Sequence, residues 1–442
     1  MTTARPSPAP ASTPATLPSG EPGTGATAPI VVMKFGGTSV ADLDRIRHVA
    51  KRVQAERARG NRVAVVVSAM AGVTNQMVGF CHDLDPLAPA AEADAVVASG
   101  EQVTSGLLAI ALNNLGVPSR SFQGWQVALH TDTAYGHAAI ESVDGEAVLA
   151  SLQKNEVPVM AGFQGLSPEG RIATLGRGGS DTSAVALAAA IGAARCDIYT
   201  DVDGVYTSDP RIVKNAQRLR HVAYEEMLEL ASGGAKVLQT RSVGLAMRER
   251  VLVRVLSSFS DVEPGRDTGT VVADEDASVE KKLVTGIAYS IDEAKFTLSR
   301  VPDQPGVAGR LFKALSEAAI NIDMIVQAIG EDGTTNLTFT AARSDEARTI
   351  RLLEELRAEI PYGALLSSRN VAKISVVGVG MRSNPGVAAT MFSTLAERGI
   401  NVQVISTSEI KVSVLIDAEY AELAMRALHT AYGLDGPAEG AA

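Results

Sequence analysis

A lysine followed by two glycines ends an apolar run near the start of the chain. The run reads IVVMKFGG, residues 30–37, and places Lys34 ahead of Gly36 and Gly37. Glycine lets a backbone approach a ligand closely, and an ammonium group balances phosphate charge. In a P-loop the lysine comes after the glycines. The sequence therefore predicts a phosphate site of another kind, with its cation on a strand and its glycine turn behind the cation.

A second charged stretch, TLGRGGSDTSA, occupies residues 174–184. Arg177 precedes a glycine pair, and Asp181 lies in the first turn of a predicted helix. An arginine fork binds a carboxylate bidentately, and the amides at a helix N-terminus bind anions. Asp181 so close to a bound anion is unfavourable unless a divalent cation lies between them. The pattern indicates binding of a carboxylate beside a phosphate.

Composition narrows the class of protein. The 442 residues carry a net charge of -10 and only 4% aromatic residues, which argues against nucleic-acid and membrane-surface partners. On the sequence pattern, we expect no apolar stretch that approaches the roughly 20 residues of a membrane span. Cys81 and Cys196 are the only cysteines, and the histidines are scattered, so we expect no disulfide and no metal-ligating cluster. These features predict a soluble cytoplasmic protein.

The pattern of elements predicts the fold. Residues 1–29 are almost wholly Pro, Ala, Ser, Thr and Gly and are expected to be disordered. From residue 30 apolar runs alternate with helical patterns, which is typical of an α/β protein with an open, mostly parallel sheet that binds ligands at the carboxyl ends of its strands. The expected strands are 30–35, 62–70, 157–163, 196–202 and 251–257, and the expected helices include 41–60, 98–116 and 181–194.

The C-terminal third contains an internal repeat beyond a polar, charged stretch, 265–283, expected to be a linker. GVAGRLFKALSEAAINIDMIVQ (306–327) aligns without gaps to GVAATMFSTLAERGINVQVIST (386–407). Each copy is preceded by one predicted strand and followed by another. This order predicts two ferredoxin-like modules. On the residues alone, a duplicated oligomerisation module is the alternative interpretation of this repeat.

The motifs together resemble one family, the aspartate kinases of the amino-acid kinase superfamily. The resemblance is carried by KFGGTSV, SAMAGVTN, SGEQ, GFQG, TLGRGGSDTSA, YTDVDGVYTSDPR and YEEMLELASGGAKVLQTRS, in that order along the chain. It implies a disordered tail at 1–29, an amino-acid kinase domain at 30–264, a linker at 265–283 and two ACT domains at 284–365 and 366–442.

The resemblance also implies roles for particular residues, with ATP and Mg²⁺ as cofactors. Catalysis would fall to Lys34, Asp181 and Lys236. ATP would bind at Lys34, Phe35, Gly36, Gly37, Thr200, Asp201, Tyr206, Arg211 and Lys236. L-aspartate would bind at Thr74, Glu101, Phe163, Arg177, Gly178, Gly179 and Ser180.

The paired ACT domains imply feedback inhibition by lysine, threonine or both, in a homodimer or higher homo-oligomer. Effectors would bind at Asp303, Asn321, Ile322, Asp323 and Gln327 in the first copy, and at Asn401, Val402, Ser406 and Thr407 in the second.

The reaction implied is transfer of the ATP γ-phosphoryl group to the β-carboxylate of L-aspartate, the first step towards lysine, threonine and methionine. Two alternatives remain open at this stage. One is a kinase for another carboxylate, such as N-acetylglutamate, against which the paired ACT pattern and the SGEQ and GFQG loops count. The other is a non-catalytic amino-acid sensor, which would be expected to lack Lys34, Arg177, Asp181 or Lys236, whereas all four are present.

Overall fold

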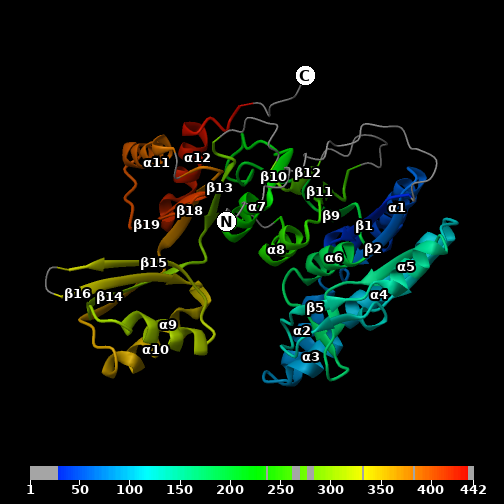
Figure 1. Ribbon diagram of the computed structural model, residues 1–442, viewed down its shortest axis with the longest axis horizontal. Helices are drawn as coiled ribbons and strands as arrows, with labels where there is room; N and C mark the ends of the chain where they lie inside the picture. Colours follow the sequence, from blue (N-terminus) through cyan, green and yellow to red (C-terminus); the bar gives the residue numbers. More distant parts are fainter. Residues whose placement is uncertain are drawn as a thin grey trace, which may run out of the picture.

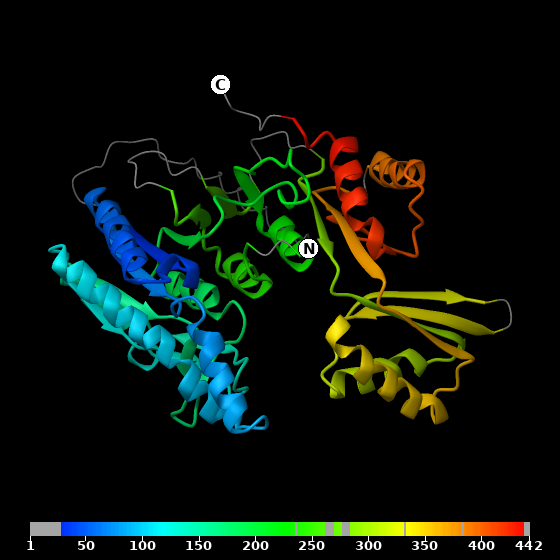
Figure 2. The same cartoon turned by 180° about the vertical axis from the view of Figure 1, so that it is seen from behind.

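The computed structural model describes residues 28–234, 237–260, 269–275, 283–330, 333–381 and 384–436. Figures 1 and 2 show an N-terminal α/β domain, coloured blue to green, beside two smaller α/β modules coloured yellow to red. The expected tail lies outside the described residues except for its last two positions, and so do Lys236 and much of the expected linker.

The N-terminal domain is built on an eight-stranded sheet in the order β10-β12-β11-β9-β1-β2-β6-β3. Its strands are β10 (His221–Ala223), β12 (Thr270–Ala273), β11 (Val253–Ser257), β9 (Arg195–Thr200), β1 (Ile30–Phe35), β2 (Arg62–Val67), β6 (Val157–Ala161) and β3 (Ser119–Phe122). All neighbours are parallel except β11 and β12. The predicted open, mostly parallel sheet is confirmed.

Helices cover both faces of this sheet, which explains why β1 and β2, apart from Lys34 and Arg62, are continuous apolar runs rather than alternating ones. Alternate β1 side chains enter two different cores: Val31 and Met33 face α1 and α4, whereas Val32 faces the opposite layer. The first layer comprises α1 (Leu43–Ala58) and α4 (Ser99–Asn114), and the second comprises α5 (Glu146–Gln153), α6 (Gly179–Ala190), α7 (Tyr224–Ser232) and α8 (Thr240–Glu249).

A smaller sheet, β5-β4-β7-β8, lies beyond the carboxyl end of β6. Its strands are β5 (Ile140–Val143), β4 (Leu129–Thr131), β7 (Gln164–Leu166) and β8 (Ile172–Thr174), and β8 packs against α3 (Ala90–Val97), which in turn packs against α2 (Val73–Leu84). Because β7 follows β6 directly and β8 leads into α6, this sheet fixes the loops at the strand ends.

The repeat forms two antiparallel four-stranded sheets, each covered by two helices. The first module contains β14 (Ala294–Pro302), α9 (Val307–Glu317), β15 (Ile322–Ile329), β16 (Thr334–Ala341), α10 (Glu346–Glu355) and β17 (Ala364–Ser368). The second contains β18 (Val371–Val377), α11 (Pro385–Glu397), β19 (Val404–Thr407), β20 (Lys411–Asp417) and α12 (Ala421–Ala431). The predicted order of strands and helices in each copy is confirmed.

The fourth strand of the second module comes from an earlier part of the chain. Strand β13 (Gly286–Ser290) lies within the range expected for the first module, but it pairs with β18 of the second. In the first module β17 takes the equivalent edge beside β14. No strand follows α12 among the described residues, so β13 supplies the hydrogen bonds that the edge of the fully buried β18 needs.

Two sequence expectations are corrected. The expected linker contains β12, which pairs with β10 and β11. The strand was missed because its sequence, TVVA, is only four residues long and lies between two charged segments. The expectation that no apolar stretch approaches membrane-span length was also wrong, because within the described residues the helical segment Ala90–Asn114 meets that length and composition. Half of its apolar window is buried, with α4 packed on β3 and β6, as in the core helix of a soluble protein.

Candidate functional site

A cavity of about 350 Å³ opens where β1, β2 and β6 end and α6 begins. Ligand sites of open α/β sheets lie at this edge. Eleven residues that the sequence singled out line it together: Lys34, Gly36, Gly37, Thr74, Glu101, Phe163, Arg177, Gly178, Gly179, Ser180 and Asp181.

Lys34 and Asp181 form an ion pair inside this cavity. Lys34 lies on β1, Asp181 lies in the first turn of α6, and the distance from Nζ to Oδ1 is 2.5 Å. Their side chains are only 10% and 11% exposed, so water screens the charges little. Among the described residues, no donor makes a hydrogen bond of good geometry to this Asp181 oxygen, which leaves it with the ammonium charge alone.

Glycines bring the backbone to the cavity wall. Gly178 ends the turn before α6 with φ of 74°, and a Cβ on it would lie 2.0 Å from Cγ of Gln239. Behind β1 the Gly36 amide donates to the carbonyl of Tyr199, at 3.2 Å, and so ties the glycine turn to β9. Any side chain at Gly178 would be strained and would clash, which explains the glycine in RGGSD.

Glu101 is buried at the base of the cavity, on the first turn of α4. It is 3% exposed; one carboxylate oxygen accepts from the Ala69 amide at 3.0 Å, and the other has no hydrogen-bond partner among the described residues. Desolvation raises the pKa of Glu101 to about 7, although the Ala69 hydrogen bond opposes the shift. A buried carboxylate with one free oxygen is suited to receive a cation.

Phe163 is held in a strained conformation beside this acid. Its φ is 68°, a region that costs a phenylalanine about 1–3 kcal/mol. Two hydrogen bonds hold it there: its amide donates to Ser183 Oγ at 3.0 Å, and its carbonyl accepts from the Leu175 amide at 2.9 Å. The ring thereby lines the cavity between β6 and β7. Strain of this kind is concentrated at functional sites.

Arg177 contributes an exposed cation at the cavity mouth, in the turn between β8 and α6. Its exposure leaves the guanidinium accessible to a ligand. Ser180 is buried, and Thr74, in the first turn of α2, is half-buried on the cavity wall. The cavity therefore combines two cations, a free carboxylate oxygen and hydroxyl groups.

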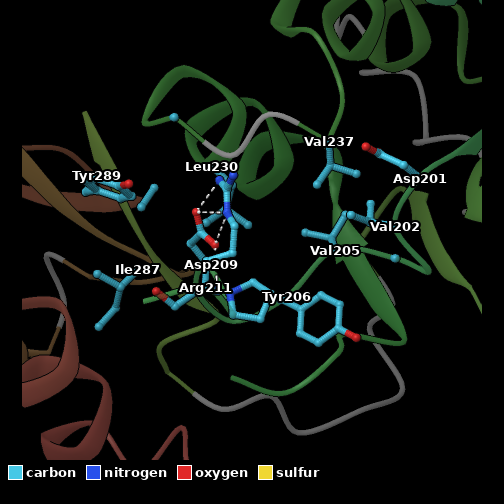
Figure 3. A pocket seen from close by; sticks show the side chains of 15 residues that line it. Asp201, Val202, Val205, Tyr206, Asp209, Arg211, Leu230, Val237, Ile287 and Tyr289 are labelled. Carbon is cyan, nitrogen blue, oxygen red and sulfur yellow. Dashed lines mark hydrogen bonds and ion pairs between the residues drawn. The ribbon is translucent and has the colours of Figure 1, made fainter. Parts of the chain in front are cut away.

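A second cavity, of about 410 Å³, follows β9 (Figure 3). Asp201, Tyr206 and Arg211, three of the residues expected at the nucleotide, line it, and Figure 3 shows Arg211 joined to Asp209 by dashed lines. Arg211 Nη2 lies 2.6 Å from Asp209 Oδ2, and the Tyr206 hydroxyl donates to Asp203 at 2.8 Å.

The remaining nucleotide residues lie elsewhere. Phe35 is fully buried and stacks on Tyr199 with the ring centroids 4.8 Å apart, so its side chain is a core residue. Thr200 donates a hydrogen bond to Asp201 at 3.1 Å but does not line the cavity. Within the described ranges no three His, Cys, Asp or Glu side chains gather as they would for a metal ion.

One residue that supports the site was missed. Asp94 on α3 is 4% exposed and accepts from both the amide and the hydroxyl of Thr174, each at 2.7 Å, and from the Gly136 amide at 2.9 Å. These bonds fix the end of β8, directly before the Arg177 turn. Its only signal in the sequence is an acid within the apolar helix AAEADAVV.

The expected effector residues lie around the junction of the two modules. Asn321, Ile322, Asp323 and Gln327 precede or belong to β15, while Asn401, Val402, Ser406 and Thr407 precede or belong to β19. These strands meet, and Met324 and Val404 share one core cluster. Asp323 pairs with Lys373 of the other module, whereas Asp303 stands exposed in the turn before α9.

Comparisons with known proteins agree with this architecture. Residues 29–257 match the model of the amino acid kinase family, and residues 296–361 and 374–432 each match an ACT domain. An aspartokinase of Pseudomonas aeruginosa is 49% identical over 92% of this chain and 98% of its own length, and one of Mycolicibacterium smegmatis is 45% identical over 93% and 97%.

Solved structures lead to the same family. The structure of E. coli aspartokinase III with aspartate and ADP, in the R-state, superposes with a TM-score of 0.76 at 27% identity, covering 91% of this chain and 99% of that one. The T-state structure of the same enzyme, with lysine and aspartate, gives a TM-score of 0.70 at 27% identity and the same coverage. The chain therefore belongs to the amino acid kinase family and, within it, to the aspartokinases.

Proposed function

We propose that this protein transfers the γ-phosphoryl group of ATP to the β-carboxylate of L-aspartate, giving 4-phospho-L-aspartate. The observation that carries the proposal is the buried Glu101 with its unpartnered oxygen in one cavity with Lys34 and Arg177. An amino acid offers an ammonium to Glu101 and a carboxylate to Arg177. A phosphate beside Lys34 would then face the side chain of that amino acid.

The nucleotide would lie across the ends of β1 and β9. The amides of Gly36 and Gly37 would bind the β- and γ-phosphates together with Lys34, and Lys236 would add a second cation. Asp201, Tyr206 and Arg211 line the neighbouring cavity and would contact the rest of ATP, with Thr200 beside them. The main support is that β1 and β9 are adjacent parallel strands, so their carboxyl ends open on one side.

The acceptor needs no general base. An aspartate carboxylate has a reference pKa of about 3.9 and is already ionised at pH 7. The difficulty is to bring two anions together, which positioned cations and helix-terminal amides overcome. Thr74, Phe163, Ser180 and the Gly178–Gly179 turn would orient the amino acid.

Asp181 suits Mg²⁺ because Mg²⁺ is bound in kinases through one or two carboxylates together with substrate phosphates. Its buried Oδ1 accepts no hydrogen bond of good geometry from the described residues, so it can turn from Lys34 to a metal. When bound, the ion neutralises phosphate charge.

Regulation is proposed together with catalysis. Lysine, threonine or both would bind at the junction of β15 and β19 and inhibit a homo-oligomer joined through its ACT domains. Aspartokinase III of E. coli was solved with lysine in its T-state, which supports lysine as one effector. The free thiols Cys81 and Cys196 suit a cytoplasmic location.

A coupled ADP-release assay tests the proposal. The full chain, ATP and Mg²⁺ are mixed with L-aspartate, L-glutamate or N-acetyl-L-glutamate, and hydroxylamine traps any acyl phosphate. We expect ADP release and hydroxamate only with aspartate. Release with N-acetylglutamate instead would assign another kinase of the superfamily, and no release with any acceptor would leave a sensor.

A further inference from the structure

The loop that carries the expected nucleotide residues also belongs to the core of the second module. Within this loop, which connects β9 to β10, Asp201, Tyr206 and Arg211 line the cavity of Figure 3. Directly after Arg211, the side chains of Ile212, Val213 and Ala216 pack among apolar side chains of the second module. The loop therefore connects the expected ATP site to the regulatory part of the chain.

Thr207 makes hydrogen bonds in this loop through its amide, its carbonyl and its hydroxyl. Its amide donates to the Gln217 carbonyl and its carbonyl accepts from the Ile287 amide of β13, both at 2.8 Å. Its hydroxyl accepts from the Gln217 amide at 2.9 Å. Thr207 directly follows Tyr206 and is 5% exposed, so a shift of Thr207 would move the cavity wall.

The hydroxyl of Thr207 makes a further contact with a histidine 222 residues away. His429 lies in the last turn of α12 and is fully buried. Its Nε2 lies 2.9 Å from Thr207 Oγ1, and its Nδ1 lies 2.7 Å from Asp435 Oδ1. A fully buried imidazole with a partner on each nitrogen is a connector between two segments rather than a space-filling side chain.

For a neutral imidazole, the hydrogen bonds on its two nitrogens give the direction of each bond. Asp435 accepts hydrogen bonds from Thr430 and His429, which lower the pKa of its carboxyl, so the carboxylate is ionised and accepts a hydrogen bond from Nδ1–H. In the neutral ring Nε2 is then an acceptor. Because Thr207 Oγ1 already accepts from the Gln217 amide, its single proton is available to Nε2. The Thr207 hydroxyl and both ring nitrogens of His429 then have hydrogen-bond partners.

We propose that His429 is a positioning residue for the ATP site, acting through Thr207. It holds the hydroxyl of Thr207, and with it the loop bearing Tyr206 and Arg211, at one fixed place against β13 and α12. The inference rests on the proposed function in that the loop binds ATP. It predicts a selective effect on the nucleotide, because the cavity with Glu101 and Arg177 has no residue from this loop.

The test compares Thr207→Val, which removes the hydroxyl at nearly constant volume, with Thr207→Ser, which keeps it. His429→Phe removes Nε2 from the other side, and Thr207→Val/His429→Phe completes a double-mutant cycle. Thr349→Val is the matched control, since this buried hydroxyl donates to the Asp345 carbonyl in the first module, away from the loop. Steady-state kinetics of the full chain give KM for ATP and for aspartate separately.

We expect Thr207→Val and His429→Phe each to raise KM for ATP roughly tenfold, because a loop displaced by a fraction of an ångström binds its ligand poorly. KM for aspartate should stay within about twofold, the double variant should be no worse than either single one, and Thr207→Ser and Thr349→Val should match the wild type.

The inference is overturned if KM for ATP is unchanged in folded variants, if both KM values rise together, or if Thr207→Ser behaves like Thr207→Val. The serine variant keeps the test decisive should His429→Phe fail to fold. Absence of aspartate-dependent ADP release in the wild-type chain is a different result, which overturns the proposed function itself.

Discussion

Lys295 and Lys373 occupy equivalent positions on the first strands of the two repeats, and each contacts the opposite module. Lys295 Nζ donates to Gln403 Oε1 at 2.5 Å, while Lys373 Nζ pairs with Asp323 and lies 3.1 Å from Glu293. Asp323 and Gln403 are themselves equivalent positions of the repeat. The two modules are thus joined by two equivalent contacts, each formed by a lysine of one module and a side chain of the other. Only the contact between Lys373 and Asp323 is an ion pair, whereas Lys295 contacts the uncharged Gln403.

This asymmetry bears on the expected effector sites. Burial lowers the pKa of Lys373, but Glu293 and Asp323 more than offset it, and the pKa lies above its ordinary value. The side chain therefore stays charged and holds Asp323. At the equivalent contact with Lys295, Gln403 carries no charge and also donates to Asp417, at 2.6 Å.

The first prediction concerns these sites. Asp323→Asn or Gln327→Ala, and Ser406→Ala with Thr407→Val, should relieve inhibition by lysine or threonine while leaving kcat within about twofold, because an effector inhibits only through its preference for one state. Activity is titrated with each amino acid alone and with both. No response of the wild type to either effector at saturation would reduce the repeat to an assembly module.

Loss of the strand lysine should remove turnover. Lys34→Met is expected to lower kcat by about 10²–10³, since it takes one preorganised cation from the phosphates. It also leaves Asp181 buried without its partner, which costs about 3–5 kcal/mol in comparable ion pairs.

A second substitution separates these two effects of Lys34. Lys34→Met/Asp181→Asn should recover most of the Tm but none of the activity. Thermal unfolding and kcat are measured on the same samples. A near-normal kcat in Lys34→Met would contradict the assignment of Lys34 to the ATP phosphates.

Arg177 should act on the amino acid alone. Because its side chain is exposed, Arg177→Ala should leave Tm unchanged but raise KM for aspartate far more than KM for ATP, by about 10² for loss of a bidentate clamp. Arg177→Lys, which keeps the charge but not the fork, should recover only part of the affinity. Equal changes in both KM values contradict the assignment.

Glu101 should make aspartate binding depend on pH near neutrality. Burial raises its pKa to about 7, so the ionised form that receives an ammonium is populated as pH rises through that value. The kcat/KM for aspartate should therefore fall as pH drops from 8 to 6, and Glu101→Gln should show a low, flat profile.

The raised pKa of Glu101 has the opposite effect on the stability of the ligand-free protein, which should decrease as the pH rises. Folded Glu101 retains its proton between its ordinary pKa and about 7, so stability should fall across that window as pH rises. Thermal unfolding of the wild type and Glu101→Gln between pH 5 and 8 measures this. A wild-type profile as flat as that of Glu101→Gln would mean that Glu101 does not titrate there.

Periodicity and glycine turns were enough to predict most of the N-terminal domain. The run IVVMKF became β1, the helix expected at 41–60 became α1, and the strand expected at 251–257 became β11. These elements are long and strongly patterned, and their partners lie close by in the sheet. The glycines of RGGSD indicated the turn before α6 because no other residue fits there.

What the sequence could not reveal depends on contacts between distant segments. The strand TVVA is too short to be distinguished from its charged flanks, and it is a strand because β10 and β11 pair with it. Phe163 is forced to positive φ by Ser183 and Leu175, which no local pattern reports. The bond of His429 to Thr207 likewise spans most of the chain.

The pairing of β13 with β18 makes the first ACT module an insertion within the second. Ser290 and Lys373 are directly opposite one another across the two strands, and the first module, from β14 to β17, lies between them in the sequence. A cut after Ser368 would therefore divide the second module rather than separate the two. A tight turn from Ser290 to Lys373, by contrast, would excise the first module and restore a simple hairpin. An exchange of the first module between related chains therefore needs two junctions, one after β13 and one before β18. A single junction between the two repeats would separate β13 from the module to which it belongs.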